Sequence, residues 1–407
     1  MCAVVLLVVA IGDMTSISEA KMPKRPVTGP QKPLGPAVAT GAFGLDLMRA
    51  QGPGNVVLSP DSVAAALAMT GTGGVGRTAR EIARTLHLKG PTVLAAVGDL
   101  QRAIVTGQAV EGRGAPPTLE IANGLFLQDA LPFSAAFLAG ARQRFGAAPQ
   151  IVDFARNSTG ALEAINGWVS EHTNGLIPEI LDSLPPRMAL ALANAIYLDA
   201  AWEHPFQPNR TTREVFHATA GDTTADFMHQ TELLRYGAGR GYRAVALPYQ
   251  SSTLSLLIVL PVAQRLGALQ NQLDGRRLAR IARGLSPTSV ALSLPRFHLN
   301  TEAELVESLK KLGMRTPFSA AANFSRITTA APLKIDFVTH AADFAVDEEG
   351  TEAAAATVVG IVRVSARRPR DPVIFNVDQP FLFFLRDDRT GATLFAGRLV
   401  DPSSDDA

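Results

Sequence analysis

The stretch from Asp347 to Ser365, DEEGTEAAAATVVGIVRVS, constrains the fold of this chain more than any other segment. It begins with acidic residues and a glycine, continues with four consecutive alanines, and ends in a run rich in valine. Alanine favours helix, whereas valine favours strand. Because the segment holds both preferences and has nothing bulky in its first half, it can change conformation at low steric cost.

As a strand, the segment would place alternate side chains on opposite faces. One face would carry only small residues that can enter a packed sheet without clashes. These residues are Thr351, Ala353, Ala355 and Thr357. The other face would carry Glu352, Ala354, Ala356 and Val358, with its charge on the side that can stay in water. Taken alone, the segment could instead be an Ala-rich surface loop or a short helix.

Several blocks of the sequence resemble the serpin family, in that family's order. EEGTEAAAAT, which begins at Glu348, resembles the serpin hinge, and residues 375–402 resemble the C-terminal signature. The remaining matching blocks are residues 55–69, 192–206, 242–261, 292–314 and 333–350. Together the blocks span about Pro36 to Pro402, so the resemblance covers nearly the whole chain and is highly specific.

The resemblance implies an α+β serpin fold, with helices packed around a large mixed main β-sheet, smaller sheets and an exposed reactive-centre loop. Helical patterns in the first half and strand patterns downstream of Leu190 agree with α+β. The patterns predict helices at 37–50, 63–70, 78–86, 91–106, 134–145 and 159–173, and strands at 55–58 and 119–127. Asp61 or Ser62 is expected to cap the second helix. Because no second linker is evident, we expect one domain over 36–402, with the loop at about 350–371.

The N-terminal residues 2–11, CAVVLLVVAI, form an apolar run of signal-peptide length that is too short to span a bilayer as a helix. With a possible cleavage site ending at Ala20, residues 1–20 are expected to be a signal peptide, followed by an extended Pro-rich linker at 21–35. No Lys or Arg precedes the run and Asp13 follows it, so the alternatives are a misplaced start codon or a short hydrophobic tail.

Export would place the protein in the extracellular space or the periplasm, and the alternative is the cytoplasm. Cys2 is the only cysteine and would be lost with a signal peptide, so the mature chain needs no disulfide. The formal net charge of +1 over 407 residues gives no general attraction to nucleic acid or to acidic lipid. We therefore expect neither nucleic acid nor, after signal removal, a membrane as a partner.

Little in the sequence indicates catalysis or a cofactor. The seven histidines show no metal-binding i, i+4 pair, zinc-type cysteines are absent, and no G-x-S-x-G elbow occurs. Residues 71–78, GTGGVGRT, satisfy G-x-G-x-x-G and nearly match a P-loop. Both motifs need a preceding strand, whereas residues 63–69 have helical spacing. We expect a glycine-rich turn between helices, no metal, no cofactor and no enzyme.

What the serpin resemblance implies is a protease inhibitor that acts once and is consumed. In that family the loop is cut as if it were a substrate, and its hinge then inserts into the main sheet and carries the acylated protease to the opposite pole. The segment from Gly350 to Val364, at roughly 3.3 Å per residue, reaches about 50 Å. A compact domain of roughly 370 residues is about 54 Å across, so the segment is just long enough. The expected partner is a target protease, held covalently by a monomer.

Family spacing places the scissile bond between Val364 and Ser365. Valine suits the shallow apolar pocket of elastase-like serine proteases, whereas the alternative, Arg363, suits trypsin-like ones; papain-like cysteine proteases are a further alternative. The competing function is a non-inhibitory serpin that acts as a binding, carrier or chaperone-like protein. Such relatives often carry a charged or bulky residue at the position of Thr351 or interrupt the alanine run, and this chain does neither.

Three groups of residues carry over from the family by motif. The hinge comprises Glu348, Glu349, Gly350, Thr351, Glu352, Ala353, Ala354, Ala355, Ala356 and Thr357. A central polar cluster beneath the main sheet comprises Ser59, Ser62, Asn194 and His340, although His340 could be an ordinary buried histidine. An upper entry point comprises Trp202, Arg296 and Glu348. An ion pair between Arg296 and Glu348 could hold the sheet shut or be a surface pair of little worth.

Overall fold

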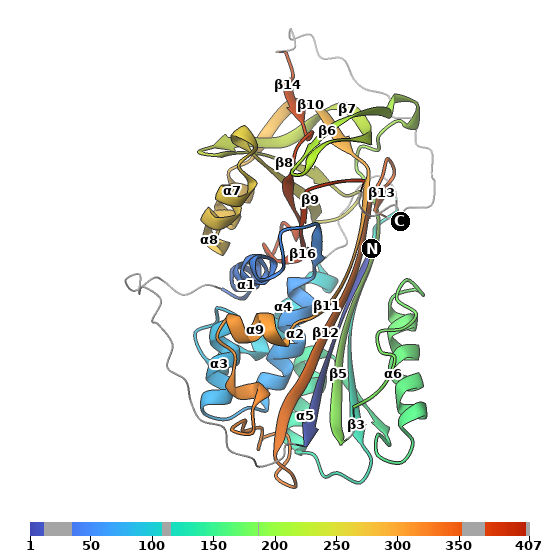
Figure 1. The fold of residues 1–407 in the computed structure, drawn as a ribbon, viewed down its shortest axis with the longest axis vertical. Helices are drawn as coiled ribbons and strands as arrows, with labels where there is room; N and C mark the ends of the chain where they lie inside the picture. Colours follow the sequence, from blue (N-terminus) through green and yellow to red (C-terminus); the bar gives the residue numbers. More distant parts are fainter. Residues whose placement is uncertain (12–34, 108–114, 186, 352–370, 404–407) are drawn as a thin grey trace.

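The computed structural model describes residues 1–11, 35–107, 115–185, 187–351 and 371–403. Most of the expected linker lies outside the described residues. So do Glu352 to Thr357 of the hinge and the predicted scissile bond between Val364 and Ser365, with its alternative at Arg363. Within the described ranges the chain forms two large sheets and the helices that pack against them (Figure 1).

The first sheet, called the main sheet below, has seven strands in the described residues, in the order β11-β12-β1-β5-β3-β4, with the short β13 beside β5. Their bounds are β11 Phe297–Glu304, β12 Leu333–Val346, β1 Cys2–Ile11, β5 Met188–Ala201, β3 Thr118–Gln128, β4 Ala148–Val152 and β13 Gly350–Thr351. Strand β1 is antiparallel to both of its neighbours. Figure 1 shows it in dark blue, starting at the N-terminal mark and running down the middle of the sheet.

Helices cover both faces of the main sheet (Figure 1). On one face α6 (Ser158–His172) buries Ala161, Ile165 and Val169 against the strands. The opposite face packs on α1 Pro36–Ala50, α2 Pro60–Thr72, α3 Arg77–Thr85, α4 Ala95–Thr106, α5 Ala135–Phe145 and α9 Val306–Lys311. Because both faces are covered, the central strands bury side chains on both sides, and β1 and β5 consist almost entirely of apolar residues.

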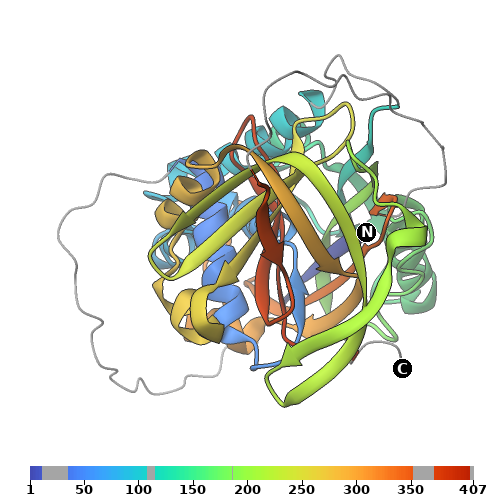
Figure 2. The same ribbon diagram turned by 90° about the horizontal axis from the view of Figure 1, so that it is seen from above.

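The second sheet has nine strands in the described residues, in the order β14-β10-β7-β8-β9-β15-β16-β2, with β6 beside β7. Their bounds are β14 Val373–Asn376, β10 Ser286–Pro295, β7 Gly221–Gly239, β8 Tyr242–Pro248, β9 Leu254–Pro261, β15 Phe381–Asp387, β16 Thr393–Leu399, β2 Val56–Leu58 and β6 Thr212–Ala218. In Figure 2, which is viewed from above, this sheet faces the reader, and α7 (Leu266–Gln272) and α8 (Gly275–Arg283) lie at its side. Phe344 of the main sheet packs against Phe383 and Phe395 and joins the two sheets.

The α+β arrangement expected from the sequence, with helices around a large mixed main sheet, is confirmed, and the predicted helices and strands occur within a few residues of the expected bounds. The second helix begins earlier than expected, because Pro60 suits the first turn. Its cap is therefore Ser59, whose hydroxyl accepts from the amide of Ser62 at 3.2 Å, and the expected caps Asp61 and Ser62 are wrong. The predicted helix at 91–106 is split into the 3₁₀ turn Pro91–Val93 and α4.

The glycine-rich segment forms a turn between α2 and α3, as expected, and the element that leads directly into it is the helix α2. The N-terminal apolar run expected to be a signal peptide forms β1, and its residues from Cys2 to Ala10 are at most 4% exposed. Removal of this segment stays a prediction. Across the described residues, no helix has the length and apolarity needed to cross a membrane.

Candidate functional site

The hinge begins with a tight turn that carries the chain from β12 back onto β5. The amide of Asp347 donates to the carbonyl of Gly350 at 3.2 Å. The Asp347 carboxylate in turn accepts from the amides of Glu349 (2.9 Å) and Gly350 (3.0 Å). A Cβ at residue 350 would lie 2.2 Å from the carbonyl oxygen of Ala200, so only glycine allows this close approach.

Thr351, the last hinge residue that the structure describes, is fully buried on the face expected to enter the core. Its hydroxyl lies 2.7 Å from the hydroxyl of Tyr249. Tyr249 stacks on Trp202 with ring centroids 4.5 Å apart, and the Trp202 indole donates to the carbonyl of Asp347 at 2.9 Å. Burial raises the pKa of the Tyr249 hydroxyl, so it stays protonated and able to donate.

Arg296 and Glu348 form the expected ion pair beside this turn. Two guanidinium nitrogens of Arg296 each donate to a carboxylate oxygen of Glu348 at 2.6 Å, and Thr211 donates a further hydrogen bond. The Glu348 side chain is 4% exposed, whereas that of Arg296 is 47% exposed. Burial raises the pKa of Glu348, but the hydrogen bonds from Arg296 and Thr211 more than offset it and hold the pKa below its usual value. The pair therefore involves a buried carboxylate and differs from a purely surface pair.

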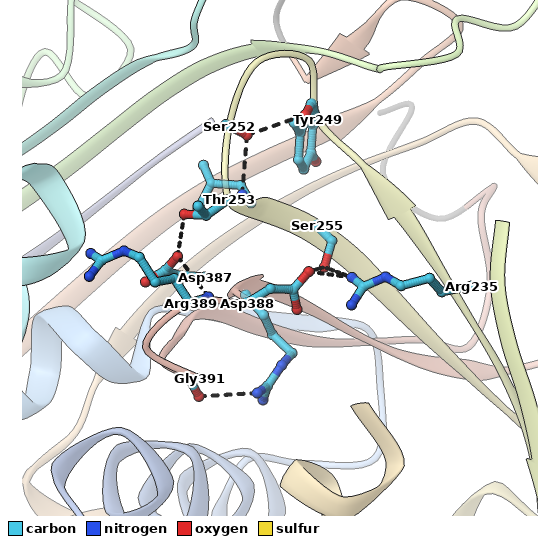
Figure 3. A network of polar contacts seen from close by, with 11 residues as sticks. Arg235, Tyr249, Ser252, Thr253, Ser255, Asp387, Asp388, Arg389 and Gly391 are labelled. Carbon is cyan, nitrogen blue, oxygen red and sulfur yellow. Dashed lines mark hydrogen bonds and ion pairs between the residues drawn. The ribbon is translucent and has the colours of Figure 1, made fainter. Parts of the chain in front are cut away.

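Sequence reasoning missed Tyr249, although it lies within one of the matching blocks. Its carbonyl accepts from the Ser252 hydroxyl at 3.3 Å, and the neighbouring Thr253 hydroxyl donates to Asp387 at the end of β15 (Figure 3). The adjacent Asp388 carboxylate accepts from Ser255 at 2.9 Å and pairs with Arg235. The residue that holds Thr351 is thereby tied to the C-terminal signature. A tyrosine at the end of an otherwise apolar strand pattern was the available signal.

His340 joins three segments in the central polar cluster. Its Nε2 accepts from the amide of Ser59 at 3.1 Å, and its Nδ1 donates to the carbonyl oxygen of Val4 in β1 at 2.8 Å. The Ser59 hydroxyl donates to the carbonyl of Leu394 at 2.8 Å and lies 3.0 Å from the Ser62 hydroxyl. Burial lowers the pKa of His340 to about 4, despite the opposing hydrogen bond to Val4, so the ring is neutral at pH 7.

The fourth predicted member, Asn194, lies opposite His340 across β1, since both residues pair with Val5. The side-chain amide of Asn194 donates to the side chain of Asn123 at 2.9 Å. The Asn123 side chain donates in turn to Gln101, and the Gln101 side chain donates to Asp61. Burial raises the pKa of Asp61 to about 6, against a hydrogen bond from Gln101. Sequence reasoning missed Asn123 and Gln101, whose polar side chains in otherwise apolar patterns were the only signal.

The described residues include no group of three or more His, Cys, Asp or Glu side chains placed to hold a metal ion. A hinge of small residues is fixed at the upper end of β5, and polar residues line the sheet where β5 and β12 are separated by a third strand.

A family model described as Serpin (serine protease inhibitor) matches residues 39–402. The chain belongs to the serpin family. An uncharacterized serpin-like protein of Thermococcus kodakarensis is 33% identical to it over 374 residues, which cover 92% of this chain and 87% of that protein. The leukocyte elastase inhibitor of Bos taurus is 35% identical over 361 residues, which cover 86% of this serpin and 93% of the inhibitor.

Solved serpin structures show the same fold. The cleaved Serpin 42Da matches with a TM-score of 0.78 and 30% identity, over 90% of this serpin and 98% of that chain. Native tengpin, a thermophilic serpin, matches with a TM-score of 0.77 and 25% identity, over 93% and 97% of the two chains. A thyroxine-binding globulin in complex with thyroxine matches with a TM-score of 0.75 and 25% identity, over 90% and 99%. The similar proteins thus include some named as inhibitors and one named for ligand binding.

Proposed function

We propose that this serpin is a suicide-substrate inhibitor of serine proteases and not an enzyme. The observation that carries the proposal is the placement of Gly350 and Thr351, already paired with Ala201 and Ala200 at the end of β5. The small residues that follow them in the sequence would extend this pairing along the main sheet. A hinge anchored in this way, with Thr351 accepted into the core, is what loop insertion requires.

The proposed covalent step takes place on the protease. Its serine hydroxyl attacks the carbonyl carbon of Val364, and the peptide bond to Ser365 breaks. The proton of that hydroxyl passes through the protease histidine to the leaving amine of Ser365, while the Val364 acyl group stays on the serine as an ester. Insertion of the hinge then moves and distorts the protease before water can hydrolyse the ester.

Two features support an elastase-like target. Val364 is β-branched and uncharged, which suits a shallow apolar pocket. Relatives named leukocyte elastase inhibitor are 32–35% identical to this chain. Arg363 and a trypsin-like protease form the alternative. The similarity to a thyroxine-binding globulin keeps a non-inhibitory binding role as the second candidate.

The proposal is tested by incubating an elastase with the chain that begins at Lys21, which is the chain left when the expected signal peptide is removed. An SDS-stable band of serpin plus protease is expected, together with a rise in melting temperature after the loop is cut. Clean cleavage with no such band and no change in melting temperature would favour the binding role. The expected signal peptide extends the proposal to export. The protein recovered from the medium or periplasm should begin at Lys21, whereas a cytoplasmic protein beginning at Met1 would contradict export.

A further inference from the structure

Strand β1 fills the gap between β5 and β12 along most of the length of the main sheet. It pairs with β12 from Cys2–Asp343 to Ile11–Leu333, and with β5 from Cys2–Tyr197 to Ala10–Met188. The hinge approaches the same gap from the top, because β13 lies on β5 at Ala200 and Ala201. Two segments from opposite ends of the chain are therefore directed into one gap.

The register of β1 is the register that an inserted loop would take. On the β5 side, Thr351 pairs with Ala200, and continuing one residue at a time would bring Ala354 opposite Tyr197. Tyr197 is the partner of Cys2.

On the β12 side, the hinge turn joins Asp347 to Gly350, and continuing from it would bring Ala354 opposite Asp343. Asp343 is also the partner of Cys2. Both edges give the same result, so Cys2 occupies the place of Ala354, and Val5 that of Thr357.

The two segments exclude each other from the first residues onward. The amino group of Met1 donates to the carbonyl of Leu198 at 3.0 Å, and the Met1 carbonyl accepts from the Leu198 amide at 2.9 Å. Leu198 is the residue that an inserted loop would pair with Ala353. Since Thr351 is already seated beside Ala200, the hinge can advance by only one more residue before it meets β1.

Strand β1 is a well-packed occupant of the gap. Every side chain from Cys2 to Val9 is 0% exposed. Val4, Leu6 and Val8 pack on the α6 side and Val5, Leu7 and Val9 on the opposite side. In this register Val4 stands in the place of Ala356, Val5 in that of Thr357 and Leu6 in that of Val358. At each of these three places the β1 residue buries more apolar surface than the loop residue would. The central polar cluster is also satisfied by β1, through the hydrogen bond from His340 to Val4.

We propose that β1 is a removable internal block: it fills the gap that the reactive-centre loop needs and keeps the full-length chain from inserting its loop. Removal of residues 1–20 during export would open the gap and make the serpin competent to trap a protease. The occupation of the gap by β1 follows from its strand pairing. The effect of that occupation on inhibition rests on the proposed function.

Cys2 gives a direct probe, because it is the only cysteine in the chain and is buried within β1. The full-length protein is treated with a chromogenic disulfide reagent, in buffer and in urea. We expect the thiol to react at least about 100-fold more slowly in buffer, since β1 must leave the sheet first. Reaction within about twofold of the unfolded rate would overturn the proposal, because β1 would then lie outside the sheet.

A matched pair of substitutions tests the block in the full-length protein. Leu7→Asp places a charge in the core, whereas Ile11→Asp places the same charge at the half-buried end of β1. We expect Leu7→Asp to speed the Cys2 reaction at least tenfold, which corresponds to about 1.4 kcal/mol in the free energy of opening β1. The same variant should raise the yield of SDS-stable elastase complex. Ile11→Asp should behave like wild type in both measurements. Leu7→Ala, which removes packing without adding a charge, serves if Leu7→Asp does not fold.

The outcomes separate the block from the proposed function. In any covalent complex of the full-length chain, Cys2 must react freely, because the loop has displaced β1. A complex in which Cys2 stays protected overturns the block. If no variant traps elastase, yet Cys2 is protected in the wild type and released by Leu7→Asp, the proposed function fails and the occupation of the gap by β1 stands.

Discussion

The imidazole of His340 donates to the carbonyl oxygen of Val4 at 2.8 Å, across 336 positions of sequence. Its other nitrogen accepts from the amide of Ser59 at 3.1 Å, so both ring nitrogens are engaged in the neutral form. A second proton would displace the Ser59 amide in a site from which water is excluded. Only the neutral ring can accept from Ser59 while it donates to Val4, so the link from Ser59 through His340 to the N-terminal strand requires a neutral His340.

The first prediction is a pH dependence of stability that His340 causes. Its pKa is about 4 in the folded chain and 6.5 when unperturbed. The unfolded chain thus takes up the proton first as pH falls through this window, and stability is lost. Between pH 7 and pH 4.5, urea unfolding should show wild type losing about 2–3 kcal/mol relative to His340→Gln.

Asp61 acts in the opposite direction in the same window. Its pKa is raised from 3.8 to about 6, so the folded chain holds the proton more tightly and gains stability as pH falls between these values. Asp61 is present in both proteins, and its contribution cancels from their difference. Parallel pH profiles for wild type and His340→Gln would show that the ring is not held neutral.

The second prediction concerns the hydrogen bond between Tyr249 and Thr351. Tyr249→Phe removes one hydroxyl and leaves that of Thr351 buried without this partner. We expect a loss of about 1–2 kcal/mol in the free energy of unfolding. The control is Tyr236→Phe, at a half-buried tyrosine that packs edge-on against Phe375. Equal effects of the two substitutions would argue against the bond.

The third prediction concerns the pair formed by Arg296 and Glu348. Arg296→Ala leaves a buried carboxylate without its guanidinium, and we expect a loss of about 1–3 kcal/mol, because the exposed side of Arg296 moderates the cost. Glu348→Gln in the Arg296→Ala background should recover part of that loss. Urea unfolding of the single and double variants measures the coupling. If the losses in the free energy of unfolding from the two substitutions simply add, the two side chains are not coupled and the pair is a surface contact.

The fold and most of the site could be predicted from the sequence, because the family motifs cover nearly the whole chain. Thr351 lies on the expected face, and the expected ion pair between Arg296 and Glu348 is present. The position of β1 could not be predicted, since a strand buried on both faces has no alternation and reads like a signal peptide. Tyr249 was missed because its role depends on a contact with Thr351 that is 102 positions distant.

The fourth prediction concerns the hinge of the chain that begins at Lys21. Thr351 is fully buried, so Thr351→Arg places an unpaired charge in the core, which costs several kcal/mol. Insertion should slow, and elastase should cut the variant without being trapped. Thr351→Ser, which keeps a small side chain with a hydroxyl, should form complex as wild type does. An undiminished yield of complex from Thr351→Arg on SDS gels would exclude insertion of this face.

The last prediction is target specificity, and it rests on two adjacent residues that lie outside the described part of the structure. Val364 carries two methyl groups on its β-carbon and no charge, so it fills a shallow apolar pocket and cannot reach the aspartate at the base of a trypsin-type pocket. Arg363 could reach that aspartate if the loop shifted by one residue, and the hinge would then be one residue shorter at capture.

The chain beginning at Lys21 should therefore form a covalent complex with elastase-like proteases and little or none with trypsin-like ones. Val364→Arg should invert that order, while Arg363→Ala should leave the trapping of elastase largely intact. Mass spectrometry of the C-terminal peptide released by the protease identifies the bond. A peptide that begins at Ser365 supports Val364, and one that begins at Val364 makes Arg363 the recognised residue. A peptide that begins beyond Arg367 refutes both, because the cut bond would then follow neither Val364 nor Arg363.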